Sequence, residues 1–349
     1  MKIATSLLTL MVCTSASLAQ ADDTYILKVA HFLPASSNAQ QNAIQPWCDE
    51  LAKESDNRLK CQIYPSMQLG GTPAQLPDQV RNGIADIVWT VPGYSSGRFP
   101  RSEAVELPFM LPANGALGSQ IIWDFYEQSL QADYKDYKVL AMHSDAGTQL
   151  HLTNTPVLAL EDFKGLKLRA SSRMAAKLIS AMGASPVSMP ASQLTESLSK
   201  GVIGGALVGW ELIPALKIDE VAPVHTEPKA DQPIFYTSLL SLLMNKKRYE
   251  ALPEDLRALI DRKSGRELSI RFGRTWDKEA ERAKALVLQR SPDAIRIIDD
   301  AQYQRMRESG DPVVQTWADD KKNINGSQLV ESLRNIAATA TVAATASRQ

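Results

Sequence analysis

Arg169 is the residue whose type and position most clearly predict chemistry. It lies at the end of a predicted strand over residues 166–170, and ligands in open α/β sheets bind just beyond the carboxyl ends of strands. A guanidinium presents a planar fork that holds a carboxylate through two parallel hydrogen bonds, which a lysine cannot do. The position therefore predicts a carboxylate-binding residue, and the alternative is a structural ion pair with a neighbouring Asp or Glu.

Sequence patterns typical of catalysis or metal binding are missing. The sequence has no GxSxG segment, and its glycine-rich stretch over 201–209 is neither a phosphate-binding loop nor a GxGxxG turn. The histidines lack metal-like spacing, and they are His31, His143, His151 and His225. We therefore expect no catalytic residue, no metal site and no cofactor, and we do not expect an enzyme.

Alternating strands and helices are the elements that must position Arg169. Apolar or alternating runs predict strands over 25–32, 58–64, 85–91, 137–143, 149–154, 166–170, 186–188 and 206–210. Helical spacing and caps predict helices between them, over 38–55, 76–82, 172–182, 192–201 and from about 214. This alternation predicts an α/β fold with at least partly parallel sheets, divided into two units.

The later part of the chain is expected to cross between the two units. An apolar run over 236–245 is long enough to cross, and a helix begins at Pro253, which Glu254 and Asp255 follow in its first turn. Helical sequence then continues to about residue 290. The low-complexity segment 337–349 is expected to be a frayed tail.

The first 21 residues read as a secretory signal peptide. Lys2 precedes an apolar stretch over 3–13 that is too short to span a bilayer, and the small-x-small segment 19–21 marks a cleavage site. No later stretch is long and apolar enough for a transmembrane helix. The net charge of −1 gives no basic excess for nucleic acid. We expect an exported, periplasmic protein that is not embedded in the membrane.

Cleavage of the signal peptide would leave two cysteines, Cys48 and Cys61. Cys48 lies on a predicted helix and Cys61 on the next predicted strand, and such neighbours normally pack together. An even number of cysteines in an oxidising compartment favours a disulfide. The alternative is two buried free thiols.

Several segments resemble the extracytoplasmic solute receptors of tripartite ATP-independent periplasmic (TRAP) transporters, a family often called dicarboxylate-binding. The resemblance covers residues 25 to 290 and rests on seven motifs in the family's order: YPSMQLG at 64–70, VRNGIAD at 80–86, ELPF at 106–109, KGLKLR at 164–169, MGASP at 182–186, MNK at 244–246 and LPEDLR at 252–257. Each motif alone is weak, and together they are specific.

The resemblance implies a two-lobed periplasmic binding protein fold with a hinge, crossing strands and a long C-terminal helix. The implied boundaries are a signal peptide at 1–21, lobe I at 22–145 and 238–262, lobe II with the long helices at 146–237 and 263–336, and the tail at 337–349. It also implies that Arg169 holds the carboxylate of a small organic ligand in the cleft, and that membrane permease subunits receive this ligand.

Other positions depart from the family's pattern. Sugar-acid receptors carry a second arginine where this chain has Gln149, a polar residue where it has Phe32, and an acidic residue where it has Val91. The family's usual DGxEN segment is replaced by residues 204–210. The expected cleft residues beside Arg169 are therefore Gln149, Phe32, Trp89, Val91, Tyr94, Val208 and Trp210, although both tryptophans could equally be core residues.

This predicted wall favours an aromatic or other apolar monocarboxylate. Buried hydroxyl groups of a sugar would lack partners, at roughly 1–3 kcal/mol each, whereas a ring would gain about 0.5–1.5 kcal/mol per good aromatic pair. A sugar acid or a dicarboxylate remains the alternative ligand. A receptor for a sensor kinase or chemoreceptor remains an alternative role, because its fold would be the same.

Overall fold

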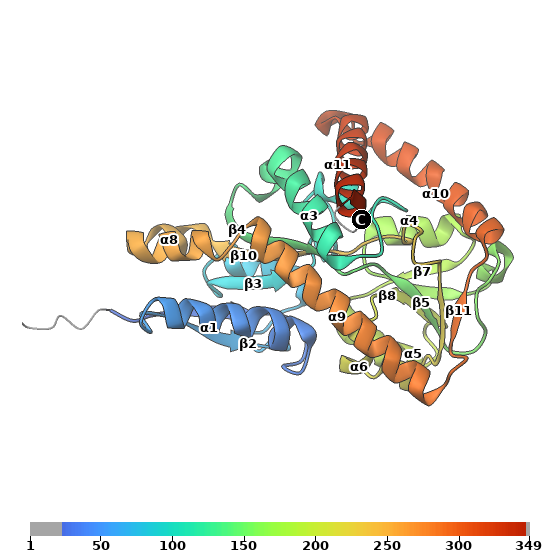
Figure 1. Ribbon diagram of the computed structural model, residues 1–349, viewed down its shortest axis with the longest axis horizontal. Helices are drawn as coiled ribbons and strands as arrows, with labels where there is room; N and C mark the ends of the chain where they lie inside the picture. The colour runs from blue at the N-terminus through green and yellow to red at the C-terminus, as the bar shows by residue number, and fades with distance from the viewer. Residues whose placement is uncertain (1–22, 347–349) are drawn as a thin grey trace, which may run out of the picture.

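The computed structural model describes residues 23–346, so the predicted signal peptide lies outside the described residues. Two β-sheets with helices around them form the molecule (Figure 1). The two-sheet α/β architecture predicted from the sequence is confirmed.

The first sheet has the strand order β2-β1-β3-β10-β4. Strands β1 and β2 are parallel, as are β1 and β3, while β10 runs antiparallel to both β3 and β4. Strand β10 is buried throughout, in agreement with its continuous apolar sequence. The strand bounds are β1 Tyr25–Ala30, β2 Leu59–Tyr64, β3 Ile87–Thr90, β4 Tyr137–Ser144 and β10 Leu239–Asn245.

The second sheet has the strand order β11-β9-β5-β8-β6-β7. Strand β6 lies parallel to β7 and β8, and β5 runs antiparallel to β8 and β9. The short strands β9 and β11 were not predicted from the sequence. The bounds are β5 Gln149–Leu152, β6 Lys167–Ala170, β7 Ser185–Ser188, β8 Gly205–Val208, β9 Val224–Glu227 and β11 Ile295–Ile297.

Helices cover both sheets and connect them. Their bounds are α1 Gln45–Glu54, α2 Leu76–Arg81, α3 Gly115–Phe125, α4 Arg173–Ala181, α5 Leu194–Ser199, α6 Leu212–Ala215, α7 Lys246–Glu250, α8 Glu254–Arg262, α9 Arg266–Arg290, α10 Asp300–Asp320 and α11 Gly326–Ala346. No helix within residues 23–346 is both long enough and apolar enough to cross a membrane.

Helix α9 runs diagonally past both sheets (Figure 1). It packs on α3 and β4 beside the first sheet, and near its other end Lys284 pairs with Glu227 at the end of β9 in the second. The contact with α3 is so close that a methyl group on Gly273 would lie 2.1 Å from the carbonyl oxygen of Gly115. Glycine at this crossing therefore allows α9 to approach α3.

The predicted continuous helix from Pro253 to about residue 290 is wrong at one point. Helix α8 ends at Arg262, and α9 begins after Gly265, whose φ of +83° is a conformation that residues with a side chain rarely adopt. The Gly265 N–H donates to the carbonyl oxygen of Leu140 in β4, 2.7 Å away. The break redirects the chain from the edge of the first sheet towards the second.

The expected frayed tail is helical as far as the structure describes it. Helix α11 continues to Ala346 and packs against α3 and α10. Its inner face carries Leu333, Ala337 and Ala340, which are buried and follow helical spacing. Because alanine is the best helix former, this alanine-rich, low-complexity segment forms a helix that contacts the rest of the protein along one narrow face.

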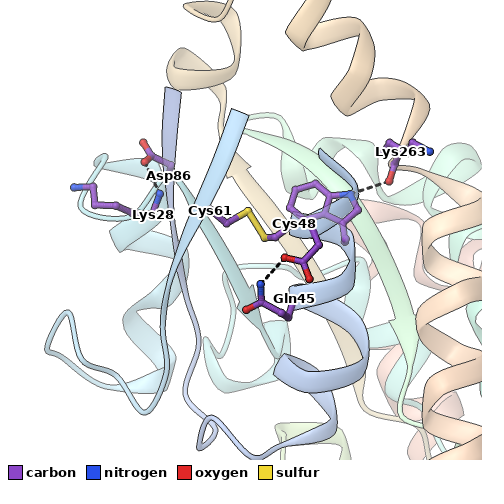
Figure 2. The surroundings of a disulfide bond; sticks show 8 residues. Lys28, Gln45, Cys48, Cys61, Asp86 and Lys263 are labelled. Atoms are coloured by element: carbon purple, nitrogen blue, oxygen red, sulfur yellow. Dashed lines mark hydrogen bonds between the residues drawn. A yellow bond between two sulfur atoms is a disulfide. The ribbon is translucent and has the colours of Figure 1, made fainter. Parts of the chain in front are cut away.

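A disulfide joins Cys48 to Cys61, with a Cα–Cα distance of 5.7 Å. Figure 2 shows that it links α1 to the edge strand β2. On the same helix, the Trp47 indole N–H donates to the carbonyl oxygen of Lys263, 2.9 Å away. These contacts fasten α1 to the sheet on one side and to the α8–α9 junction on the other.

Candidate binding pocket between the two sheets

A small pocket lies where the two sheets face each other. Its walls come from the ends of β1 and β3, from β10 in the first sheet, and from the ends of β6 and β8 in the second. Its free volume is about 30 Å³. The pocket therefore opens beyond the carboxyl ends of parallel strands, which is where α/β sheets bind ligands.

The structure brings six of the eight predicted cleft residues together in this pocket, namely Phe32, Trp89, Val91, Tyr94, Arg169 and Val208. Gln149 and Trp210 are not among its lining residues. Gln149 is buried on β5, opposite Val208 in the antiparallel ladder.

Trp210 turns away from the pocket. Strand β8 ends at Val208, so Trp210 lies in the following turn. Its ring contacts His151 and His225, with centroids 4.9 and 4.8 Å away, and its indole N–H donates to Glu227. The structure thus gives Trp210 the core role that the sequence left open.

Arg169 is 2% exposed, and hydrogen bonds hold its guanidinium in place. Nε donates to the carbonyl oxygen of Met189 at 3.0 Å, and Nη1 donates to that of Leu207 at 3.3 Å. Nη2 donates to the Tyr94 hydroxyl at 3.3 Å. Because a guanidinium has five N–H groups, one N–H remains on each of Nη1 and Nη2. That pair matches the two oxygens of a carboxylate.

No carboxylate neutralises Arg169 within the described residues. None of the ion pairs among residues 23–346 includes it. The nearby Arg173 differs, because its Nη2 lies 2.5 Å from an oxygen of Glu103. A buried cation without a counter-ion is costly, so Arg169 is poised for an anion, whereas Arg173 is already paired.

Aromatic rings form the wall contributed by the first sheet. Phe32 stacks on Trp89 with centroids 5.2 Å apart, and Tyr94 meets Phe32 edge to face at 5.4 Å. The Trp89 indole N–H donates to Nε2 of His143 at 3.0 Å. Burial lowers the pKa of His143 to about 3, so this ring is neutral and accepts the bond. Trp89 is therefore fixed by both packing and a hydrogen bond.

Two acidic residues also line the pocket, Asp145 and Glu211, and the sequence analysis missed both. Asp145 directly follows β4, and its two oxygens accept the N–H groups of Gly147 and Ser238 at 2.9 and 3.0 Å. It thereby connects the segment that leaves β4 to the segment that enters β10. Glu211 follows β8, and its position just beyond a strand end was the signal that could have identified it.

Burial governs the charge of these carboxyl groups. Desolvation raises the pKa of Asp145 to about 6. Burial, together with the negative charge of Asp145, raises the pKa of Glu211 well above its ordinary value. Carboxyl groups with raised pKa values and an unpaired guanidinium in one concave site are typical of a binding site. Residues 23–346 contain no group of three or more His, Cys, Asp or Glu side chains that could hold a metal ion.

A family model described as bacterial extracellular solute-binding protein, family 7, matches residues 29–320. The chain belongs to this family. Several similar chains of known structure are solute-binding proteins of TRAP transporters. One of them, from Rhodoferax ferrireducens, is 36% identical, with a TM-score of 0.88. That similarity covers 92% of this chain and 100% of the relative, whose structure contains copurified benzoate.

Two further structures are similar over nearly the whole chain. One is a marine metagenome TRAP solute-binding protein specific for aromatic acid ligands, in complex with 3-hydroxybenzoate. It is 35% identical over 91% of this chain and 99% of that one, with a TM-score of 0.88. The other, from Bordetella bronchiseptica, contains (R)- and (S)-mandelate. It is 28% identical over 90% of this chain and 99% of that one, with a TM-score of 0.82.

Proposed function

We propose that this protein is the periplasmic receptor of a TRAP transporter and that it binds an aromatic monocarboxylate. The observation that carries the proposal is the buried, unpaired guanidinium of Arg169 facing a wall of aromatic rings. Arg169 holds the ligand carboxylate through its remaining N–H groups on Nη1 and Nη2. The ring of the ligand packs against Phe32, Trp89 and Tyr94.

The charges of the pocket favour one carboxylate over two. Arg169 is the one Arg or Lys among the pocket's lining residues in the described part of the chain. A second ligand carboxylate would meet the carboxyl groups of Asp145 and Glu211 instead of a cation. Such a buried, unpaired anion is costly, so a C4-dicarboxylate is disfavoured.

The apolar wall disfavours a sugar acid for a different reason. Phe32, Val91 and Val208 offer surface without hydrogen-bonding side chains. A polyhydroxylated ligand would leave several hydroxyl groups without partners there, at roughly 1–3 kcal/mol each. The aromatic acids bound by the relatives described above agree with this choice of ligand class.

Ligand entry requires the pocket walls to separate. The free volume of about 30 Å³ is far below the ~150 Å³ of an apolar cavity that accommodates benzene. Because the two walls belong to different sheets, a relative rotation of the lobes about a hinge would open the site. Hinge closure around a ligand is a well-established transition of periplasmic binding proteins.

Calorimetry with the purified mature protein tests the proposal. We expect benzoate or a close aromatic acid to bind at least tenfold more tightly than succinate or sialic acid. The Arg169→Ala variant should lose at least a hundredfold in affinity for the aromatic acid, because a charge-assisted bidentate contact is removed. Tighter binding of succinate or sialic acid would overturn the ligand class.

Arg296→Ala is the matched control for the arginine variant. Arg296 lies on the edge strand β11 with a half-exposed side chain, outside the pocket. This variant should bind the aromatic acid as the unmodified protein does. Near-native affinity in Arg169→Ala would contradict the role proposed for Arg169.

The transport role is tested separately in cells. Deletion of the gene should abolish high-affinity uptake of the labelled aromatic acid, and the full-length chain should restore it. Fractionation should place the mature protein in the periplasm, with its N-terminus after residue 21. Unchanged uptake in the deletion strain would favour a sensory receptor instead.

A further inference from the structure

Glu211 leaves a buried hydrogen-bonding atom unsatisfied inside the pocket. The residue is 5% exposed, and no group among the described residues bonds its Oε2 with full hydrogen-bond geometry. The buried indole N–H of Trp276 lies near the carboxyl group and partly offsets the effect of burial on its pKa. Its side chain folds back over Gly209, so closely that a methyl group on Gly209 would lie 2.0 Å from Oε2. Both residues line the pocket. The chain therefore holds this carboxyl group at the pocket wall, near the Trp276 indole, without a well-formed hydrogen bond to Oε2.

Asp145, the other acidic residue of the pocket, does not share this property. The N–H groups of Gly147 and Ser238 bind its two oxygens. Its carboxylate is therefore engaged in holding the segments that connect the sheets. Of the two carboxyl groups, Glu211 is the one with an oxygen free to contact a ligand.

Arg169 does not satisfy Glu211 either. The two side chains line the same pocket, yet no ion pair within 4.0 Å joins them. A buried cation and a buried carboxyl group that stay apart would normally be costly. A ligand that places its carboxylate on Arg169 and a second polar group on Glu211 satisfies both.

The second polar group is best supplied by a hydroxyl. A hydroxyl group donates to an ionised carboxylate and accepts from a protonated one, so it suits Glu211 in either state. An ammonium group suits only the ionised form, and burial with the charge of Asp145 disfavours that form. The aromatic wall requires the rest of the ligand to remain apolar.

We propose that Glu211 is a specificity-determining residue that hydrogen-bonds a hydroxyl group on the ring of the ligand, so that the pocket selects hydroxyaryl carboxylates over unsubstituted ones. This inference rests on the proposed function, and it adds the substituent that the pocket recognises. The carboxylate contact at Arg169 supplies affinity for every aryl acid, and Glu211 discriminates among them.

The experiment compares benzoate, 3-hydroxybenzoate and 4-hydroxybenzoate by calorimetry at pH 7. The unmodified protein should bind at least one hydroxylated acid roughly tenfold or more tightly than benzoate, as expected for a hydrogen bond that satisfies a buried group. In Glu211→Met, which keeps the length and loses the polar atoms, this preference should fall to within about twofold. Glu211→Gln keeps hydrogen-bonding atoms and should retain part of it.

Glu220→Met is the matched control, because Glu220 is exposed and lies nearby in the sequence, outside the pocket. It should leave all three affinities unchanged. Thermal unfolding checks that each variant is folded. If Glu211→Met does not fold, the ligand preference of Glu211→Gln is compared with that of the unmodified protein instead.

The outcomes separate this inference from the proposed function. If the aryl acids bind but Glu211→Met keeps the full preference, or the unmodified protein prefers benzoate, the role of Glu211 is wrong and the proposed function stands. If none of the three acids binds the unmodified protein while another class of acid does, the proposed function fails and this inference fails with it.

Discussion

The two walls of the pocket have opposite chemistry. The first sheet contributes packed rings, with Phe32 and Trp89 stacked at 5.2 Å and Tyr94 against them. The second sheet contributes Arg169 at the end of β6 and Glu211 beyond β8. The first sheet adds one carboxyl group, Asp145 after β4, but the N–H groups of Gly147 and Ser238 already bind its oxygens. One wall therefore offers mainly shape and apolar area, and the other offers the charged groups that are free to bind a ligand.

This division means that neither sheet holds a complete site. A ring alone gains burial from the first wall, but its carboxylate has no partner there. Arg169 alone binds an anion without selecting its body. The bond from Arg169 Nη2 to the Tyr94 hydroxyl is a direct link between the walls. We infer that selectivity arises only when both walls contact the ligand together.

Trp89 and Trp210 show how the walls differ in detail. Both tryptophans lie at or just after a strand end, and both are nearly fully buried. Trp89 is part of β3, and its ring lines the pocket. Trp210 follows the end of β8 and packs on His151 and His225 outside the pocket. Equal burial thus corresponds to different roles.

The largest effect should come from replacing Trp89. We expect Trp89→Ala to lower the free energy of unfolding by about 3–5 kcal/mol, because truncating a buried tryptophan leaves a cavity. It also leaves Nε2 of the buried His143 without its donor. Affinity for the aromatic acid should fall as well. Urea denaturation and calorimetry measure the two effects.

Trp210→Ala is the control that tests the comparison between the walls. Its loss of stability should be similar, since its ring is equally buried. Its affinity for the aromatic acid, measured well below the unfolding transition, should stay within about threefold of the unmodified protein. A loss of binding as large as that of Trp89→Ala would show that the pocket extends to Trp210.

A smaller effect should come from Glu106, a buried carboxyl group at the start of the ELPF motif. Burial raises its pKa to about 7, and the nearby Glu103 and Asp145 act in the same direction. In the folded protein Glu106 keeps a proton that the unfolded chain releases near its ordinary pKa of 4.5. Stability contributed by this group is therefore lost as the pH rises from about 4.5 to about 7.

Glu106→Gln should remove this pH dependence. At pH 5 the ionisation of Glu106 should contribute little to the difference in free energy of unfolding between the two proteins. Between pH 5 and pH 8 the free energy of unfolding of the variant should rise by about 2 kcal/mol relative to that of the unmodified protein. Urea unfolding midpoints at both pH values measure the change. Parallel pH profiles would show that Glu106 is not protonated in the folded state.

Part of this site was predictable from the sequence. Alternating apolar runs located the strands, and the rule that ligands bind at strand ends placed Arg169 in a cleft. Phe32 and Val208 were expected in the cleft because of the family resemblance, and they line the same pocket from different sheets. Strand ends that converge at one edge can be deduced from the order of the elements, without knowledge of side-chain contacts.

The rest depended on contacts that the sequence does not contain. The orientation of Trp210 depended on the end of β8 at Val208, two residues earlier than predicted. The roles of Asp145 and Glu211 depended on backbone N–H groups and on the space above Gly209. The break at Gly265 required a positive φ that no periodicity indicates. In each case the outcome depended on contacts between segments that are distant in the sequence, which local sequence patterns do not reveal.

The smallest effect should come from the hydroxyl group that links the two walls. Tyr94 accepts from Arg169 Nη2 at 3.3 Å and from the backbone N–H of Ala191 at 3.1 Å. Tyr94→Phe keeps the ring against Phe32 and removes both bonds. We expect affinity for the aromatic acid to fall about three- to tenfold, in keeping with about 1 kcal/mol for a net hydrogen bond, mainly through faster dissociation.

Tyr249→Phe is the matched control, because it removes a hydroxyl group that is bonded to Asp261 on α8, outside the pocket. This variant should leave binding unchanged. If Tyr94→Phe binds the aromatic acid as tightly as the unmodified protein in stopped-flow and calorimetric measurements, only packing joins the two walls. The hydrogen bond from Arg169 to the Tyr94 hydroxyl would then contribute nothing to ligand affinity.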